Sequence, residues 1–581
     1  MAHMETDRST ARPSASDAAF KALDKAMGDV HEGSMRFQQV SYADKASLLR
    51  NLIPRAVAAA EEWVQASCIA KGIRIDSHTA GEEWIAGPAV TVRNMRLLAE
   101  SMDVLAQGRQ PFDALKFRTR TDGKCEVNVF PASRFDAVLF GGFTAKVTLR
   151  TPEPTLGCFN PAPERTRIGS PICVVLGAGN VSSIPAMDVL YKVFCEGKPC
   201  VLKMNPVNGY LAPIFEKVFE PLIALGILRI VQGGAAEGSY LCNHRLAGEV
   251  HITGSDATHD AIVWGPPGPE HDARKANDLP VLKVPITSEL GNISPVIVVP
   301  GSYTIMELAT MARNVVTQVV NNGSFNCNAA KMLVTSKHWE QREEFLRLVR
   351  GLLKHAPTRK AYYPGAKQRY LTLLKAKARS GNVVITTDAK VTDDALPWMF
   401  VTGLDPNDRS EPLFRTEPFC GILSETALDA TDEFDFMYKA GAFCNERLWG
   451  TLNACVMVSP ASEKDDMFAM SLEHLVDELR YGTVGINHWP AVGYALVTTP
   501  WGGYPGATIK DPQSGIGWVH NTFMLGAVEK VVIRGPLVAR PKPAWFYDNA
   551  AARTIGRKLV AFEAEPSWLK IPSIALTALF G

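Results

Sequence analysis

The chain has 581 residues, of which 46% are hydrophobic and 21% charged, and its formal net charge is +1. This length exceeds one ordinary hydrophobic core, so two or three domains are expected, and the balanced charge excludes the basic surface that nucleic acids require. The eleven cysteines show neither CxxC spacing nor a regular framework. This pattern favours reduced thiols in a cytoplasmic protein and argues against a disulfide scaffold or a metal site.

The two ends of the chain differ in character. Residues 1–15 are polar and lack the apolar segment of a secretory signal, so a disordered tail is expected there. No apolar stretch reaches the roughly 18 residues that a membrane-spanning helix needs. The C-terminal extension, residues 540–581, ends in the apolar segment IPSIALTALFG. It is expected to dock on its own protein, on a partner subunit or at a membrane surface.

The first part of the chain reads as helical. Between residues 16 and 105 apolar residues recur at a spacing of three to four, and Ser41 is a candidate helix cap. Segments with strand character follow at 126–130 and 145–151. The proline-rich segment 151–171 then predicts a boundary.

Beyond this boundary, strands and helices alternate. The short apolar runs PICVVLGAGN, PCVLKMNP, ILRIVQGG and EVHITGS are separated by helical stretches. Such alternation predicts a parallel sheet in a doubly wound α/β domain. A second α/β stretch covers residues 295–490, and VEKVVIRGPLVA at 528–539 predicts a late strand.

Three side chains are candidates for catalysis. Cys327, in NNGSFNC, is a candidate nucleophile on a loop or helix start, where the helix dipole would lower the thiol pKa; a buried structural cysteine is the alternative. Glu289, in TSELGN, is a candidate general base after a strand, or else a surface acid. Asn180 ends PICVVLGAGN, at the edge where parallel sheets bind ligands, and its side-chain amide can donate a hydrogen bond to an oxyanion. The alternative is an asparagine that shapes a turn in a glycine-rich loop.

A second group of residues suits a nucleotide. Lys203 ends the strand PCVLKMNP and can hydrogen-bond ribose hydroxyls; the alternative is a lysine whose stem packs and whose ammonium group is solvated. The turn GGAAEG contains Gly234 and Gly238, and TGS contains Gly254 and Ser255. Both turns suit a phosphate or adenine at a helix N-terminus, but neither is a GxGxxG fingerprint.

In this order, the segments LGAGN, VLKMNP, SELGN, SFNC and TEPFCG resemble the aldehyde dehydrogenase superfamily, and RLWGTL, YGTVGIN and QSGIG extend the resemblance over residues 41–536. The resemblance implies an α/β fold with a doubly wound Rossmann-like cofactor domain, an α/β catalytic domain and a small β oligomerisation flap. It divides the chain into cofactor-binding segments 16–130 and 168–288, a catalytic segment 289–495, flap segments 131–167 and 525–539, and the extension 540–581.

The resemblance also assigns roles to individual residues. It places Cys327 as the nucleophile, Glu289 as the general base and Asn180 as the amide that holds the oxyanion. The implied cofactor-binding residues are Lys203 and Glu417 at the riboses, Phe419 near the nicotinamide, and Gly234, Gly238, Gly254 and Ser255 at the turns.

The implied activity is NAD- or NADP-dependent oxidation of an aldehyde to a carboxylic acid through a cysteine thiohemiacetal and a thioester. Family flap strands pair with a neighbouring subunit, so a homodimer or homotetramer is implied. The aromatic content of the extension suggests a hydrophobic aldehyde and an extension that covers the substrate entrance of its own or a neighbouring subunit.

The sequence departs from the family pattern at several places. The segment GSFNC at 323–327 has one residue more than the usual Gly-Gln-x-Cys and lacks the glutamine. Pro206 stands where the family often has an acidic residue at the adenosine ribose, which makes NADP a candidate beside NAD. Cys420-Gly421 replaces the usual Gly-Pro, and GATIKDP interrupts a loop near the substrate mouth.

Two other functions stay open at this point. A coenzyme A-acylating aldehyde dehydrogenase or acyl-CoA reductase would share the nucleophile but usually does not need the glutamate, so Glu289 weighs against it. A catalytically silent member that serves as a binding or structural protein is the second alternative, because the loop before Cys327 is altered.

Overall fold

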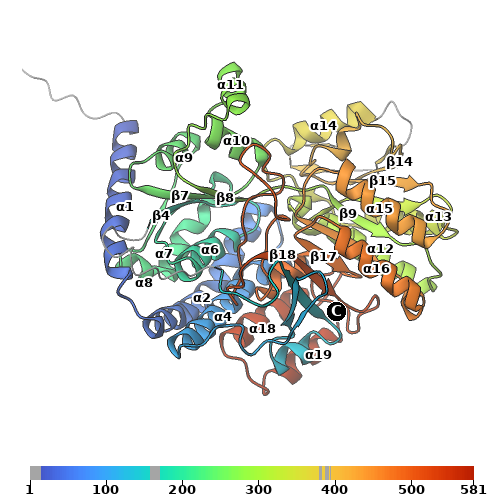
Figure 1. The fold of residues 1–581 in the computed structure, drawn as a ribbon, viewed down its shortest axis with the longest axis horizontal. Helices are drawn as coiled ribbons and strands as arrows, with labels where there is room; N and C mark the ends of the chain where they lie inside the picture. The colour runs from blue at the N-terminus through green and yellow to red at the C-terminus, as the bar shows by residue number, and fades with distance from the viewer. Residues whose placement is uncertain (1–14, 158–170, 378–382, 386–390, 393) are drawn as a thin grey trace, which may run out of the picture.

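The computed structural model describes residues 15–157, 171–377, 383–385, 391–392 and 394–581. Two sheets, each with helices packed on it, form an α/β protein, as the sequence predicts (Figure 1). Residues 1–14 of the predicted tail and residues 158–167 of the predicted flap lie outside the described residues. The domain boundaries themselves stay a prediction.

The smaller sheet has five parallel strands in the order β6-β5-β4-β7-β8. Its strands are β4 (Ile172–Leu176), β5 (Cys200–Lys203), β6 (Leu228–Val231), β7 (Ala247–Thr253) and β8 (Ile286–Glu289). The chain runs outward from β4 to β6 and then returns to the other side of β4 with β7. This reversal makes the edge beyond β4 and β7 a topological switch point, where doubly wound sheets bind ligands.

The helices around this sheet are α6 (Ile184–Leu190), α7 (Ala212–Val218), α8 (Glu220–Ala224), α9 (Ala235–Cys242), α10 (Asp256–Trp264) and α11 (Pro269–Asn277). The N-terminal helices are α1 (Ala15–Phe37), α2 (Tyr42–Lys71), α3 (Gly81–Trp84) and α4 (Val90–Ala106). The predicted cap of α2 is confirmed, because Ser41 Oγ accepts a hydrogen bond from Asp44 N at 3.1 Å.

The larger sheet has eleven strands in the order β1-β2-β3-β18-β17-β16-β9-β10-β15-β14-β12. They are β1 (Phe117–Thr119), β2 (Cys125–Phe130), β3 (Thr144–Leu149), β9 (Ser294–Val298), β10 (Ala330–Ser336), β12 (Val383–Ile385), β14 (Met399–Leu404), β15 (Ile422–Leu428), β16 (Asn453–Met457), β17 (Thr483–Ile486) and β18 (Val528–Arg534). A separate pair joins β11 (Arg359–Lys360) to β13 (Ala395–Leu396). The strands predicted near 126–130, 145–151 and 528–539 are therefore present as β2, β3 and β18.

The remaining helices of the main body are α5 (Arg134–Leu139), α12 (Ile305–Val320), α13 (Arg342–His355), α14 (Ala366–Lys377), α15 (Glu433–Arg447), α16 (Asp466–Glu478) and α17 (Ala491–Leu496). Figure 1 shows α12, α13, α15 and α16 beside the larger sheet, on the opposite side of the molecule from α1 and α7. Buried apolar side chains of the strands fill the space between sheet and helices.

The strands of the predicted flap pair differently from the expectation. β18 pairs in parallel with β17 and antiparallel with β3, and all three strands belong to one chain. The expectation that these strands pair with a neighbouring subunit is therefore wrong for this structure, because the edge of β17 is already covered from within. Dimer or tetramer formation stays a prediction.

The C-terminal extension docks on its own protein and contains α18 (Ala552–Ala564) and α19 (Ile571–Ala578). Figure 1 shows α18 beside the N-terminal helices α2 and α4. Helix α18 approaches α3 closely, since a methyl group added at Gly556 would lie 2.6 Å from Trp84 Cβ. Of the three docking modes expected from the sequence, docking within the chain is the one observed.

A buried cluster of charges holds the extension in place. The guanidinium of Arg93 donates to Glu563 Oε1 and to Asp136 Oδ1, both at 2.9 Å, and to the Leu496 carbonyl at 3.0 Å. Arg96 donates to the second carboxylate oxygen of Glu563 at 2.5 Å. Because these carboxylates are buried with their partners, the cluster fixes α18 against α4 and α5.

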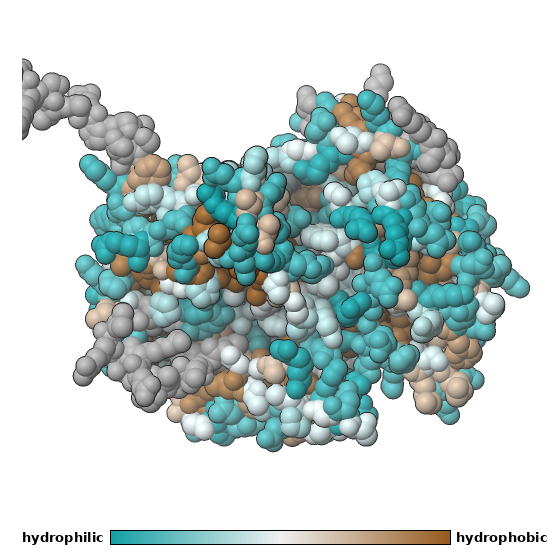
Figure 2. All heavy atoms as spheres, turned by 45° about the horizontal axis from the view of Figure 1, so that its top comes forward, coloured by the Kyte–Doolittle hydropathy of each residue, from teal (hydrophilic) through white to brown (hydrophobic). Residues whose placement is uncertain are grey.

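The surface of the molecule is mostly polar on the face shown in Figure 2. Figure 2 shows one face of the molecule, on which hydrophilic side chains predominate and hydrophobic ones form small separate groups. Within the described ranges, no helix combines the length and the apolar character needed to cross a bilayer.

The buried charge cluster generates a stability prediction. Glu563→Ala removes the carboxylate that Arg93 and Arg96 share, so we expect the free energy of unfolding to fall by about 3 kcal/mol. Glu565→Ala removes an exposed carboxylate at the end of the same helix and is expected to change it by less than about 0.5 kcal/mol. Urea unfolding followed by circular dichroism measures both. Equal, small effects would show that the cluster does not hold the extension.

Candidate active site

Cys327 lies on the loop that connects α12 to β10. The short 3₁₀ turn Asn321–Ser324 precedes it, and Asn322, Gly323 and Ser324 all have positive φ angles, of 51°, 66° and 69°. Such a run is strained for residues other than glycine and turns the chain sharply before the thiol.

The expected helix-dipole effect on Cys327 is wrong. The residue follows the end of the 3₁₀ turn and does not begin a helix. Burial raises the pKa of the Cys327 thiol well above its usual value, and the nearby Glu289 carboxyl raises it further. The half-buried thiol is therefore protonated at rest, and it needs a base to become a nucleophile.

Glu289 provides the carboxyl that lies beside the Cys327 thiol. It is the last residue of β8, its side chain is buried, and its carboxyl interacts with the Cys327 thiol and the Trp501 side chain, while its Oε1 has no hydrogen-bond partner among the described residues. Burial raises the pKa of Glu289 to about 8, although the hydrogen bonds oppose this shift. A carboxyl with this pKa can both accept and return a proton near neutral pH.

Asn180 follows β4 and is tied to the nucleophile loop. Its Nδ2 donates to the Phe325 carbonyl at 2.9 Å, and its own carbonyl accepts from Asn322 Nδ2 at 2.9 Å. Lys71 Nζ and the Tyr362 hydroxyl donate to the same carbonyl at 3.0 and 3.1 Å. An amide nitrogen carries two hydrogens. In the described contacts one of them is used, so the second can be directed at a substrate oxygen.

The residues that hold Asn180 and its loop were not predicted from the sequence. Lys71 forms a buried ion pair with Glu83 at 2.8 Å. Glu82 pairs with Arg359 at 3.0 Å and accepts a hydrogen bond from Asn322 N at 3.0 Å. Glu82 is 277 positions from Arg359 and 240 positions from Asn322, and no local pattern marks these contacts.

Lys331 was also missed. It lies four positions after the nucleophile in β10, is buried, and its Nζ donates to the carbonyls of Asn326 at 2.9 Å and Ala329 at 3.0 Å. It also forms an ion pair with Glu417 at 2.9 Å. A lysine within the apolar strand AKMLVTS was the available signal, because a buried ammonium requires acceptors.

A cavity of about 980 Å³ lies at the switch point beyond β4 and β7. Cys327, Glu289 and Asn180 line one end of it. All the predicted cofactor-binding residues line it as well: Lys203, Gly234, Gly238, Gly254, Ser255, Glu417 and Phe419. The structure thus brings together side chains that are spread over more than two hundred residues of sequence.

Several features of this cavity suit a dinucleotide. Helix α9 begins beside Gly234, whose N–H donates to Glu237, and α10 begins after the cap residue Ser255. Two helix N-termini therefore point positive partial charge at the cavity. Asn205, which follows the end of β5 at Lys203, also lines the cavity. Position 206 is a proline, which is not among the described lining residues. It therefore provides no carboxylate to the cavity.

Phe419 belongs to an aromatic cluster behind the nucleophile loop. Its ring lies 4.9 Å from Tyr363 and 6.0 Å from Phe325, measured between centroids, and Phe325 in turn packs against Tyr362. Tyr363 lines the cavity with Phe419. The buried Phe325 ring therefore anchors the altered loop by packing, in the absence of the usual glutamine.

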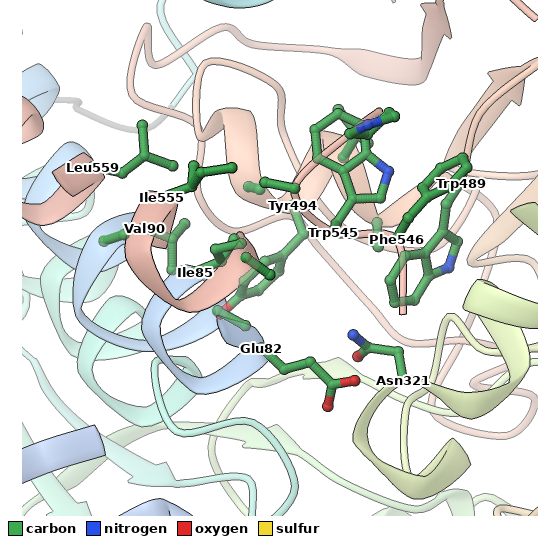
Figure 3. Close-up of a pocket in the computed structure, with 18 of the residues that line it drawn as sticks. Glu82, Ile85, Val90, Asn321, Trp489, Tyr494, Trp545, Phe546, Ile555 and Leu559 are labelled. Carbon is green, nitrogen blue, oxygen red and sulfur yellow. The ribbon is translucent and has the colours of Figure 1, made fainter. Parts of the chain in front are cut away.

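A second cavity, of about 340 Å³, meets the first at Cys327, Glu289 and Asn180, which line both. Its walls are mainly aromatic and aliphatic, and Figure 3 shows Trp489, Tyr494, Trp545 and other side chains directed into it. The thiol lies where the two cavities meet, so a ligand in each would come together at sulfur.

Part of the chain is similar in sequence to curated aldehyde dehydrogenases. No protein-family model matches the chain. 4-Trimethylaminobutyraldehyde dehydrogenase from Bos taurus is 29% identical over 173 residues, 29% of this chain and 31% of that protein. The Homo sapiens protein of that name is 30% identical over 166 residues, 28% of this chain and 30% of that protein. The match thus spans about a third of the length of these curated relatives.

Solved structures match over most of the chain. An aldehyde dehydrogenase from Pseudomonas aeruginosa has a TM-score of 0.60 and 15% identity, with 89% of this chain and 90% of that chain covered. An NADP complex of NADP-dependent glyceraldehyde-3-phosphate dehydrogenase from Bacillus halodurans has a TM-score of 0.59 and 15% identity, with 88% and 91% covered. These structures establish the fold of the chain.

The chain has the fold of aldehyde dehydrogenases, and over part of its length it is similar in sequence to curated aldehyde dehydrogenases. The resemblance inferred from its sequence motifs is thereby confirmed. Within this superfamily fold, the positions of Cys327, Glu289 and Asn180 are fixed by the structure, and their roles are proposals.

The thiol–carboxyl contact generates a labelling prediction. At about pH 9, above the Glu289 pKa, the carboxylate disfavours the Cys327 thiolate, so Glu289→Gln should raise the alkylation rate of Cys327 several-fold. Iodoacetamide labelling, followed by mass spectrometry of the Cys327 peptide, measures the rate. The control is Glu340→Gln, which changes an exposed carboxylate and should leave the rate unaltered. The same rate in all three proteins would contradict the contact.

Proposed function

We propose that this chain oxidises an aldehyde to a carboxylic acid with NAD or NADP, through a thioester on Cys327. The observation that carries the proposal is the contact between the Cys327 thiol and the Glu289 carboxyl at the junction of two cavities. One cavity has the residues expected to hold a dinucleotide, and the other has apolar walls suited to an aldehyde.

The first stage forms a thiohemiacetal. The Cys327 thiol gives its proton to Glu289 while sulfur forms a bond to the aldehyde carbon. The carbonyl electrons move to oxygen, and Asn180 Nδ2 together with the Cys327 backbone N–H stabilises the oxyanion. One such donor contributes about 3 kcal/mol in comparable sites.

The second stage oxidises and releases the acyl group. Phe419 lines the cavity where a nicotinamide would bind, and that ring would supply the hydride acceptor. The oxyanion reforms the carbonyl as the hydride leaves the carbon, and a thioester remains on Cys327. Glu289, after losing its proton to solvent, takes a proton from water, whose oxygen attacks the thioester and displaces the thiolate. Aldehyde, oxidised cofactor and water thus give acid, reduced cofactor and a proton.

The proposed cofactor is NAD or NADP. Lys203 and Glu417 line the cavity where ribose hydroxyls would bind, and α9 and α10 direct their N-termini into it. The solved relatives of this fold include an NADP complex. Without an acidic side chain from position 206, repulsion of the NADP 2′-phosphate is reduced, so both cofactors are proposed.

The alternatives are weaker on this structure. Acyl transfer to coenzyme A needs no buried base, whereas here Glu289 contacts the thiol directly. A silent member would have no need for a half-buried thiol between two cavities. As substrates, we propose aldehydes with a hydrophobic chain, and the names of the curated relatives add trimethylammonium aldehydes as a class to test.

The assignment of Glu289 generates a kinetic prediction. Glu289→Gln cannot activate water, but it also removes the carboxylate that disfavours the Cys327 thiolate, so at about pH 9 hydride transfer should still give a burst of about one NAD(P)H per active site, followed by turnover reduced about 100-fold. In the wild type, kcat should rise as pH increases through about 8, because the carboxylate is the base, and the variant should lose this rise. Stopped-flow absorbance with NAD and NADP in parallel measures both effects.

Two controls complete this experiment. Cys327→Ala should abolish the burst and the turnover, whereas Cys444→Ala, at a buried cysteine outside both cavities, should keep them. Normal turnover in Cys327→Ala would refute the proposed function. Normal turnover without a burst in Glu289→Gln would refute the base role alone.

A further inference from the structure

The C-terminal extension supplies one wall of the cavity that opens on Cys327. Its contribution includes side chains from the segment before α18, from α18 and from α19: Trp545, Phe546, Tyr547, Ile555, Leu559 and Ile574. The opposite wall comes from the body of the chain, where Ile85, Val90 and Tyr494 face the same space (Figure 3). The wall thus joins segments that are about 450 residues apart in sequence.

This wall is a fixed part of the protein. Glu563, on the same helix as Ile555 and Leu559, is buried and shared by Arg93 and Arg96. The close approach of Gly556 to Trp84 positions the helix further. The lining residues named above therefore all come from one chain and are held in place by contacts within it.

The acidic side chains around the cavity are already compensated. Among the described lining residues, the acidic ones are Glu82, Glu289 and Glu563. Glu82 is paired with Arg359, and Glu563 with Arg93. The raised pKa of Glu289 keeps its carboxyl largely neutral near pH 7.

Positive charge is present in the same lining. Arg540 and Lys542 lie on the segment that enters the extension. Lys542 pairs with Asp548 at 3.5 Å, and Arg540 is exposed, with its Nη2 3.1 Å from Met306 Sδ. A cationic ligand would therefore lose water without gaining an uncompensated carboxylate, which is unfavourable.

The aromatic rings introduce a competing expectation. Trp489, Tyr494 and Trp545 could attract a quaternary ammonium group through cation–π contacts, worth about 0.5–2 kcal/mol each. The aliphatic residues Ile85, Val90 and Ile555, which line the same cavity, offer no such attraction. Neutral apolar groups gain contact with both kinds of side chain, at about 25 cal/mol per Å² of buried apolar area.

We propose that residues 539–578 form a fixed apolar wall that makes this chain select neutral aldehydes with an apolar tail over cationic aldehydes of the same shape. This specificity rests on the proposed aldehyde oxidation. It assigns a role in substrate choice to Ile555 and Leu559, which lie outside the motif segments of the resemblance.

The test compares two isosteric aldehydes with the full-length protein. One is 4-trimethylaminobutyraldehyde, and the other is the neutral aldehyde in which carbon replaces its quaternary nitrogen. We expect kcat/KM for the neutral aldehyde to be at least about tenfold higher, a difference of about 1.4 kcal/mol. Equal values, or a preference for the cation, would overturn the proposal.

A matched pair of variants locates the preference in the wall. Leu559→Glu places an uncompensated carboxylate on the cavity face of α18 and should shift the ratio of the two kcat/KM values toward the cation at least about tenfold. Ala561→Glu adds the same charge on the exposed face of that helix and should leave the ratio unchanged. An unchanged ratio in a folded Leu559→Glu protein would place the selectivity elsewhere and contradict the role of the wall.

The outcomes separate this inference from the function on which it rests. Acetaldehyde, which has no tail beyond its methyl group, serves as the reference substrate. Failure to oxidise acetaldehyde and both isosteres would contradict the proposed function. Oxidation of all three without discrimination would leave that function intact and refute the selectivity. The wild-type comparison needs no variant, so it decides even if Leu559→Glu does not fold.

Discussion

The contact between the Cys327 thiol and the Glu289 carboxyl is the constraint on which the rest of the site depends. Glu289 is buried and Cys327 is half-buried, and burial raises the pKa of each. Two negative charges this close in a poorly solvated site are unfavourable, so the pair holds at least one proton at neutral pH. That coupling links the two stages of the proposed reaction, because one carboxyl receives the thiol proton and later a proton from water.

The fold meets this constraint by bringing together the ends of two sheets. Glu289 ends β8 of the smaller sheet, and Cys327 precedes β10 of the larger one. The hydrogen bond from Asn180 to the Phe325 carbonyl joins the two halves beside the thiol, and Lys331 secures the loop from its other side. The two cavities then meet at sulfur, where a cofactor and an aldehyde would have to meet.

Sequence patterns located the chemistry because its residues follow apolar strands, whose carboxyl ends share one edge of a sheet. They did not locate Lys71 or Lys331, because their partners come from distant segments and are known only once the chain has folded. The expectation of a lowered thiol pKa was wrong because a strained turn, and not a helix start, precedes Cys327. The flap strands likewise pair within the chain, since strand periodicity does not distinguish a neighbour in the same chain from one in another.

The most direct test of the account is mass spectrometry of the Glu289→Gln protein, quenched in acid shortly after mixing with an aldehyde and oxidised cofactor. The account predicts that the peptide containing Cys327 gains the mass of the acyl group, and that hydroxylamine removes it, as expected for a thioester. Reduced cofactor formed without an acyl group on Cys327, or an acyl group on another cysteine, would contradict the central claim.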